Sequence, residues 1–436
     1  MPSASLPILI AGGGIGGLSA ALGLAQKGFS VLVLEKAAQL GEIGAGIQLG
    51  PNAFHCFDAL GVGEAARRTA VYIDQLRLMD ALTAEEITHI DLGEAFRQRF
   101  GNPYAVVHRG DLHGVLLKAC EEHPNVDLRV SAEVAGYDQD VATVTARLAS
   151  GERVAGAALI GADGLWSNVR RQVVGDGKPR VSGHTTYRSV IPTEQMPQDL
   201  RWNAATLWAG PKCHIVHYPL SGWKVFNLVV TYHNDAPEPV AGKPVSEEEV
   251  RRGFEHVHER ARQIIGHGRD WRLWVLCDRD PVETWVDGRV GLLGDAAHPM
   301  LQYFAQGACM AMEDAVCLAH TMERHGGDVE RALDDYRRQR VARTARVQLQ
   351  SRAIGDHIYH PAGAHALVRN EIMRAKSSQD YYEHLAWLYG GTGLAADAPP
   401  SPRGEGGDGR VSARPGGAEP RCVTSSIGLP PHPGRA

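Results

Sequence analysis

A glycine-rich turn near the N-terminus constrains the fold of this chain more than any other feature. Gly12, Gly14 and Gly17 follow the apolar run at residues 7–11 and stand at the start of a helical pattern. The next apolar run ends in Glu35, at the roughly twenty-residue spacing typical of dinucleotide sites. Backbone N–H groups at such a turn can meet a pyrophosphate, and the acid can accept the ribose hydroxyls. The pattern predicts a βαβ unit that binds FAD or NAD, because Glu35 would repel the 2′-phosphate of NADP.

Three later apolar runs, 31–36, 157–164 and 290–297, also end in Gly, Asp or Glu. Their continuous apolarity predicts strands that are covered on both faces of a parallel sheet. From about 181 to 275 the pattern changes to alternating strands, and Ser221-Gly222 indicates a hairpin turn in an antiparallel sheet. We expect three helical stretches, at 246–265, 309–325 and 329–350.

The predicted fold is α/β, with a Rossmann-like FAD-binding domain, an inserted antiparallel β-sheet substrate domain and a C-terminal helical region. The FAD-binding domain is expected to be discontinuous. Its expected segments are 1–71, 105–180 and 276–328; the substrate domain takes 72–104 and 181–275, the helical region takes 329–398, and 399–436 is a disordered tail because it has few large apolar residues.

Composition narrows the class of protein. The chain has 436 residues, 44% of them hydrophobic, and a net charge of −5 with scattered basic residues, which argues against a nucleic-acid partner. Its seven cysteines show no C-x-x-C spacing, so we expect a reducing cytoplasm and no metal site. The N-terminus lacks the features of a signal peptide, and no apolar run reaches the roughly 18 residues of a transmembrane helix.

Alone, the glycine motif fits an NAD dehydrogenase as well as a flavoprotein. Two further stretches, "GADGLWSNVR" (161–170) and "GLLGDAAHP" (291–299), resemble the conserved motifs of the FAD-dependent aromatic hydroxylases, the single-component flavoprotein monooxygenases. The resemblance implies that Asp295 binds the ribityl chain of a non-covalent FAD and that Asp163 serves FAD and the pyridine nucleotide. In "HRGDL" it implies that Arg109 lies near the pyrophosphate, although an arginine there also fits an ordinary surface salt bridge.

The stretch "AQGACMAMEDA" (305–315) is expected to begin a helix whose N-terminus, at Gly307 and Ala308, faces the flavin. The usual wording in the family is Gly-Gln-Gly-x-Asn, from which Ala305 and Cys309 depart. Residues 295–315 are similar to the 3-hydroxybenzoate 6-hydroxylases, whereas salicylate hydroxylases typically have Leu-Pro-His at 301–303.

The strand "KCHIVHYPL" (212–220) carries the candidate substrate residues. Its alternation puts His214, Val216 and Tyr218 on one face and His217 on the other. From the strand alone, His214 and Tyr218 also fit ordinary core or surface residues. The resemblance implies instead that this face meets the flavin ring and that His214, Tyr218 and Gln302 form the catalytic set.

A phenol with a pKa of about 10 costs about 4 kcal/mol to ionise at neutral pH. We therefore expect His214 to act as general base, with Tyr218 and Gln302 orienting the substrate and Tyr104 as a weaker candidate for the pocket wall. The implied reaction is the para-hydroxylation of 3-hydroxybenzoate to gentisate (2,5-dihydroxybenzoate) with O₂ and with NADH as a transient reductant.

Three alternatives stay open at this point: a salicylate 1-hydroxylase that releases catechol, a related hydroxybenzoate or hydroxynicotinate hydroxylase, and a flavin-binding protein without catalysis. The resemblance also implies a homodimer, with 329–394 as a plausible contact region.

Overall fold

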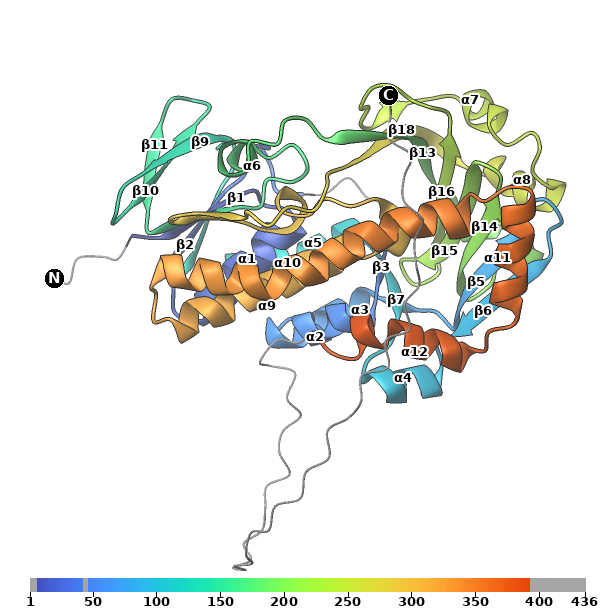
Figure 1. Ribbon diagram of the computed structural model, residues 1–436, viewed down its shortest axis with the longest axis horizontal. Helices are drawn as coiled ribbons and strands as arrows, with labels where there is room; N and C mark the ends of the chain where they lie inside the picture. Colours follow the sequence, from blue (N-terminus) through green and yellow to red (C-terminus); the bar gives the residue numbers. More distant parts are fainter. Residues whose placement is uncertain (1–5, 42–45, 393–436) are drawn as a thin grey trace, which may run out of the picture. The chain divides into compact units, whose positions relative to one another are not determined.

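A six-stranded sheet forms the centre of the half of the molecule that contains the glycine turn (Figure 1). The computed structural model describes residues 6–41 and 46–392 of the chain, so the tail predicted at 399–436 lies outside the described residues. Strands β20, β12, β1, β2 and β8 are parallel, and β19 pairs antiparallel at one edge. The four apolar runs of the sequence analysis form four of these parallel strands, which confirms the predicted fold class. In sheet order the strands are β19 (Val286–Asp287), β20 (Val290–Leu292), β12 (Ala158–Gly161), β1 (Ile8–Ala11), β2 (Val31–Leu34) and β8 (Val126–Arg129).

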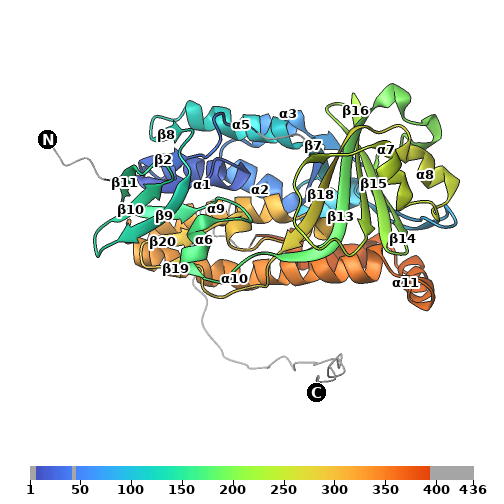
Figure 2. The ribbon, with the colours of Figure 1, turned by 90° about the horizontal axis from the view of Figure 1, so that it is seen from above.

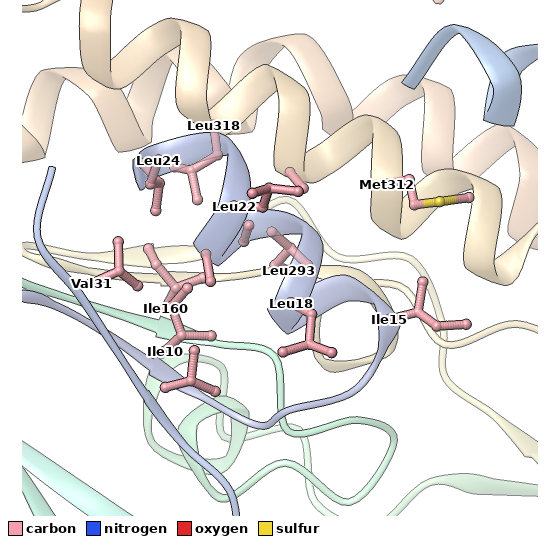
Figure 3. Close-up of a cluster of buried hydrophobic side chains, with 14 of the residues drawn as sticks. Ile10, Ile15, Leu18, Leu22, Leu24, Val31, Ile160, Leu293, Met312 and Leu318 are labelled. Atoms are coloured by element: carbon pink, nitrogen blue, oxygen red, sulfur yellow. The ribbon is translucent and has the colours of Figure 1, made fainter. Parts of the chain in front are cut away.

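Helix α1 (Ile15–Gln26) starts immediately after the glycine turn and packs between this sheet and α9 (Gly307–Arg324). Its apolar side chains, among them Leu18, Leu22 and Leu24, lie toward Ile10 and Ile160 of the strands and toward Leu318 of α9 (Figure 3). Small residues allow the two helices to approach, since a Cβ at Gly23 would come within 3.2 Å of Ala319 Cβ. This packing fixes the glycine turn relative to the start of α9.

Two small three-stranded sheets and five short helices complete this half. The sheet β11-β10-β9 contributes Val134, Val144 and Leu148 to the same hydrophobic core. The elements are β3 (Gly46–Leu49), β4 (Val71–Tyr72) and β7 (Ala105–His108) in one sheet; β9 (Val134–Gln139), β10 (Val144–Leu148) and β11 (Arg153–Gly156) in the other; and α2 (Pro51–Ala59), α3 (Gly63–Thr69), α4 (Glu94–Phe100), α5 (Arg109–Glu121) and α6 (Asn168–Val173).

The region expected to be an antiparallel insert forms most of an eight-stranded sheet. The predicted hairpin at Ser221-Gly222 joins β15 to β16, and both residues have the positive φ that such turns need. One pair differs from the expectation, because β14 runs parallel to β5. In sheet order the strands are β17 (Lys243–Pro244), β18 (Arg269–Asp278), β13 (Arg180–Pro192), β16 (Val225–His233), β15 (Cys213–Leu220), β14 (Ala204–Gly210), β5 (Gln75–Asp80) and β6 (Glu86–Asp91).

The helices expected in the second half of the chain are present, and one of them is divided. The stretch 246–265 forms two helices instead of one, α7 (Glu247–Arg252) and α8 (Glu259–Ile265). The long helix α10 (Val329–Ile354) runs beside α9 and continues toward the eight-stranded sheet (Figure 2), where Arg352 pairs with Asp278 of β18 at 2.7 Å. Two shorter helices follow, α11 (Ala364–Arg374) and α12 (Ser378–Tyr389). No helix in the described part of the chain is long and apolar enough to cross a membrane.

A buried ionic cluster links α10 to α9. Arg340 of α10 is only 1% exposed, and it donates from Nε to Asp314 Oδ1 at 2.6 Å and from Nη1 to Glu313 Oε2 at 2.7 Å. Asp314 in turn accepts the N–H of Gly294 at 3.0 Å and contacts His298 Nε2 at 2.5 Å. The cluster therefore anchors the turn that follows β20.

We expect Arg340→Met to lower the free energy of unfolding by about 3–5 kcal/mol, because it leaves the buried Asp314 without its arginine partner, whereas Glu313 keeps its ion pair with Arg343. Arg338→Met is the matched control on the same helix, since its side chain is 71% exposed and pairs only at the surface with Asp334; its cost should stay below about 1 kcal/mol. Urea denaturation followed by tryptophan fluorescence measures both. Equal small losses in the two variants would contradict the structural role of the cluster.

Candidate cofactor and substrate site

One cavity of about 1120 Å³ joins the glycine turn to the inner face of the eight-stranded sheet. This volume exceeds the roughly 300–1,000 Å³ of pockets that hold a single small ligand. Every site residue named from the sequence except Gly17 lines it. The cavity therefore has room for a dinucleotide and a second, smaller molecule side by side.

The glycine turn has the close-packed geometry that a dinucleotide requires. Gly12 has φ +108°, and a Cβ there would come within 2.4 Å of the Ala162 carbonyl oxygen. A Cβ at Gly17 would come within 2.0 Å of the Gly12 carbonyl oxygen, which explains why this glycine is needed although it does not line the cavity. Gly14, the N-cap of α1, leaves the first N–H groups of the helix facing the cavity without a capping side chain.

Glu35 lies at the end of β2 and lines the same end of the cavity. Its Oε2 accepts the N–H of Gly13 at 2.7 Å, and its Oε1 accepts the N–H of Ala37 at 2.8 Å. These two bonds hold the carboxylate in place and leave a lone pair on each oxygen for a ligand hydroxyl.

Asp295 lies in the 3-10 turn Gly294–Ala296, and its side chain is exposed on the cavity wall. A Cβ on Gly307, the first residue of α9, would be 3.8 Å from Asp295 Oδ1, so the carboxylate and the helix start face each other. Gly307 and Ala308 both line the cavity. Small side chains here let a polyol approach between an acceptor and a set of backbone N–H donors.

Ala305 and Cys309, the two residues that differ from the usual family motif, lie before and within the start of α9. Ala305 precedes α9 with φ +51°, the left-handed conformation that glycine adopts without cost. Cys309 is fully buried, and burial raises the pKa of its thiol to about 12. The loop geometry is therefore kept with an alanine, and Cys309 is a packing residue without thiolate character.

Asp163 and Arg109 also line the cavity. The Asp163 carboxylate accepts a bond from Ser167 Oγ at 2.5 Å and from the Asn168 N–H at 2.8 Å, while burial raises its pKa. Asp163 thus orders the turn into α6 in addition to any contact with a ligand. Arg109 is the first residue of α5 and lines the cavity at that helix start.

The substrate candidates lie on the sheet face that looks into the cavity. His214, Val216 and Tyr218 alternate along β15 and all line it, and Tyr104 joins them with its hydroxyl bonded to Gln48 Oε1 at 2.7 Å. His217 points to the opposite face, where its Nε2 accepts the N–H of Trp208 at 3.1 Å. Burial raises the pKa of the Tyr218 phenol, which therefore stays protonated and can donate a hydrogen bond.

Gln302 is held by partners that sequence reasoning missed. Its Nε2 donates to Thr186 Oγ1 and Thr231 Oγ1, each at 3.2 Å, and its Oε1 accepts from Arg188 Nη2 at 3.0 Å. Both amide hydrogens are used by the threonines, so Gln302 retains only one lone pair for a ligand.

Arg188 is the cation of this part of the cavity. Among the described residues it makes no ion pair with a carboxylate, and the titratable or charged neighbours that act on it are Tyr218 and Arg109. Burial lowers the pKa of the guanidinium, and its Nε has no hydrogen-bond partner. A partly buried guanidinium without an anionic partner among the described residues favours a negatively charged ligand. The signal in the sequence was an arginine at an inward-facing position of the alternating stretch "HTTYRSVIP".

His214 is a neutral imidazole in a set of rings. Burial, followed by the influence of His360 and His184, lowers its pKa well below the usual range. Its Nδ1 lies 2.8 Å from His360 Nε2, which leaves Nε2 as the nitrogen available toward the cavity. The second histidine, His360, follows the π-helical turn Gly355–Tyr359 and was not predicted, because it is 146 residues distant from His214 along the chain.

Comparison with known proteins agrees with this geometry. The family profile described as "FAD binding domain" matches residues 5–351. The chain is 58% identical to "3-hydroxybenzoate 6-hydroxylase 1" of Aquipseudomonas alcaligenes over 88% of this chain and 97% of that protein. It is 51% identical to the "3-hydroxybenzoate 6-hydroxylase" of Polaromonas naphthalenivorans (90% and 99% covered) and 48% identical to that of Klebsiella oxytoca (88% and 96%).

Solved structures show the same fold. Klebsiella pneumoniae HpxO, crystallised with FAD and uric acid, has a TM-score of 0.77 at 25% identity, with 88% of this chain and 96% of that chain covered. A salicylate hydroxylase substrate complex has a TM-score of 0.75 at 24% identity, with 88% and 95% covered.

Proposed function

The chain belongs to the FAD-dependent aromatic hydroxylases that share this FAD binding domain, and on that premise we propose that it converts 3-hydroxybenzoate to gentisate with NADH and O₂. One observation carries the proposal. Three relatives, each aligned with this chain over at least 96% of the relative's own length, share the name 3-hydroxybenzoate 6-hydroxylase. A cavity with a neutral histidine and an unpaired cation supports the same substrate class, a phenol that bears a carboxylate.

FAD fits the residues that line the other end of the cavity. The close approach at Gly12 and Gly17, the open start of α1 and the exposed carboxylate of Asp295 match a pyrophosphate and a polyol chain. Bound FAD would supply the redox chemistry of the reaction, namely hydride acceptance from NADH and activation of O₂ for the hydroxylation. The protein residues bind and orient the acid, exclude water and manage the phenolic proton.

We assign His214 Nε2 to the proton of the substrate hydroxyl. A neutral imidazole within hydrogen-bond reach can take this proton as oxygen transfer proceeds, and such bases contribute about 10²- to 10⁴-fold. Removing the proton matters because the phenolate is much richer in electrons at the position para to the oxygen, which is carbon 6. Tyr218, protonated at neutral pH, can donate to the oxygen of the substrate.

The first test is product analysis with the purified, FAD-loaded protein, NADH and oxygen. We expect gentisate from 3-hydroxybenzoate and faster NADH oxidation when that acid is present. Catechol from salicylate with no product from 3-hydroxybenzoate would identify a salicylate 1-hydroxylase instead. NADH oxidation that no hydroxybenzoate accelerates would favour a flavin-binding protein without hydroxylase activity.

Arg188 is expected to bind the carboxylate, because it lines the cavity beside Tyr218 and makes no ion pair with a carboxylate of the described residues. We expect Arg188→Met to raise KM for 3-hydroxybenzoate about tenfold or more, since a charge-assisted bond typically stabilises a complex by about 1.5–3 kcal/mol. Arg188→Lys, which keeps the charge but loses the planar fork, should show an intermediate KM. KM should rise only for substrates that carry a carboxylate. An unchanged KM for 3-hydroxybenzoate in Arg188→Met would show that the carboxylate binds elsewhere.

We also propose a homodimer in a reducing cytoplasm. Cys120, Cys213, Cys277, Cys309 and Cys317 are free thiols, which fits the compartment. Helix α11 exposes Leu367 (71%), Val368 (53%) and Ile372 (53%) together, and such a patch typically marks a protein contact.

Analytical ultracentrifugation tests the assembly. We expect the native protein to be a dimer. The triple variant Leu367→Lys, Val368→Lys and Ile372→Lys should be a monomer, because the contact would have to bury three charges. Val141→Lys, at an 89% exposed position outside α11, is the control. A monomeric native protein at micromolar concentration would contradict the dimer.

A further inference from the structure

A second histidine contacts the proposed base at the nitrogen that does not face the substrate. His214 Nδ1 and His360 Nε2 lie 2.8 Å apart, and the planes of the two rings differ by 25°. The ring centroids are 5.0 Å apart, which is close to the N···N distance plus the two distances from ring centre to nitrogen. Both nitrogens therefore lie between the ring centres. The contact is a nearly coplanar hydrogen bond along the direction in which an imidazole donates or accepts.

The π-helical turn Gly355–Tyr359 places His360 beside β15. The His360 N–H donates to the Gly355 carbonyl oxygen at 3.0 Å, and this five-residue spacing makes the turn one residue longer than an α-helical turn. The Tyr359 hydroxyl donates to the Tyr303 carbonyl oxygen at 3.1 Å, and a Cβ at Gly355 would come within 2.6 Å of the Tyr303 ring. The turn is thus packed against a residue of the cavity wall, which fixes the position of His360.

The hydrogen bond between the two histidines has two possible arrangements. Burial lowers the pKa of His214 well below its usual range and that of His360 to about 3, so both rings are neutral at pH 7. One ring must then donate and the other accept, because each neutral ring carries a single N–H proton. Either arrangement leaves the buried His360 Nδ1 without a partner among the described residues, so this nitrogen does not choose between them.

The substrate hydroxyl distinguishes the two arrangements, because its proton needs an acceptor. Arg188 offers only donors, and Tyr218 stays protonated because burial raises its pKa. Gln302 Oε1 keeps one lone pair, but an amide oxygen is too weak a base to take the proton away. His214 Nε2 can take it only when the resident proton of His214 is on Nδ1, with His360 Nε2 as its acceptor.

We propose that His360 is a positioning residue whose Nε2 accepts the Nδ1–H of His214 and so keeps Nε2 of His214 free for the substrate hydroxyl; this inference rests on the proposed function. When the phenolic O–H bond breaks, His214 Nε2 gains the proton and the substrate oxygen keeps the electron pair. The Nδ1–H bond stays intact, so no proton leaves the two rings, and the oxygen later takes its proton back from Nε2. The bond to His360 strengthens as His214 becomes charged, because charge-assisted hydrogen bonds are the stronger ones.

Two substitutions of His360 separate the hydrogen bond from packing. His360→Gln keeps a polar group near the position of Nε2, and its amide oxygen can accept the Nδ1–H of His214. His360→Leu removes the acceptor and keeps a side chain of comparable size. His89→Leu is the matched control, because His89 is a partly exposed histidine of β6 that contacts Glu86.

The first measurement is the steady-state rate of gentisate formation by the FAD-loaded enzyme. We expect His360→Leu to lower kcat about tenfold or more while KM and FAD content stay near wild type, because the lost bond acts mainly in the transition state. His360→Gln should recover most of the lost rate, and His89→Leu should be unchanged. A wild-type kcat in His360→Leu overturns the proposal, as does a His360→Gln kcat as low as that of His360→Leu.

Fluorinated 3-hydroxybenzoates give a measurement that a mere packing defect does not change. Fluorine beside the hydroxyl lowers the phenol pKa and leaves carbon 6 free, so ionisation of the substrate depends less on the base. The ratio of the wild-type rate to the His360→Leu rate should therefore shrink as the phenol becomes more acidic. A ratio that is equal for every phenol shows a packing effect and overturns the proposal.

Nitrogen NMR of the wild-type enzyme tests the tautomer without any change at His360. Protein labelled with ¹⁵N-histidine is measured with bound 3-hydroxybenzoate in the absence of NADH, and the His214 signals are those lost in His214→Gln. We expect His214 Nδ1 to carry a proton, and a bare Nδ1 overturns the proposal. Wild-type enzyme that forms no gentisate contradicts the proposed function instead, and the same spectra are then measured with whichever phenol that enzyme binds.

Discussion

The cofactor site depends most on the buried ion pairs that Arg340 forms with Glu313 and Asp314. Arg340 connects two helices, and through Asp314 it fixes the backbone of Gly294 and the ring of His298, directly beside the turn that presents Asp295. Glu313, its other partner, also accepts from Asn52 of α2 at 2.8 Å, and Asn52 donates to Gln306 at the start of α9. A buried ion pair adds little stability compared with an apolar pair of the same volume, but losing one member is costly. The cluster therefore acts mainly on specificity, because packing α9, α10 and the turn in any other register would leave a charge unpaired in the core.

Local patterns predicted the elements of the fold well, and their long-range pairing less well. The continuous apolar runs and the glycine turn fixed the parallel sheet and α1, since both signals depend on neighbouring residues only. The break between α7 and α8 was missed, although Gly253 ends the first helix. The parallel pairing of β14 with β5 was also missed, because alternation shows which face of a strand is buried but not which strand lies beside it. The exact boundaries of the two domains stay a prediction.

The same distinction applies to the candidate site. The residues named from motifs line one cavity, with Gly17 packed directly behind it, since each motif lies at the end of a strand or the start of a helix that the fold brings together. Arg188 and His360 belong to no sequence motif. Arg188 is identified by its hydrogen bond to Gln302, which is 114 residues away, and His360 by its contact with His214, which is 146 residues away. The structure also changes the interpretation of Gln302. Its amide is occupied by Thr186, Thr231 and Arg188, which makes it a residue that holds the guanidinium in place as much as one that meets the substrate.

The register of the sheet explains how one pocket could bind a carboxylate and deprotonate a phenol. Arg188 pairs with Val229, and Val229 pairs with Val216, so two valines lie on the line from the cation to β15. Both valines line the cavity and give an aromatic ring an apolar floor, with Arg188 at one end and His214 two residues from Val216 at the other. If the carboxylate is bound at Arg188, its loss as CO₂ would give up a buried ion pair during the reaction. Anchoring therefore favours hydroxylation that retains the carboxylate, and the neutral histidine keeps a second cation from competing with Arg188 for it.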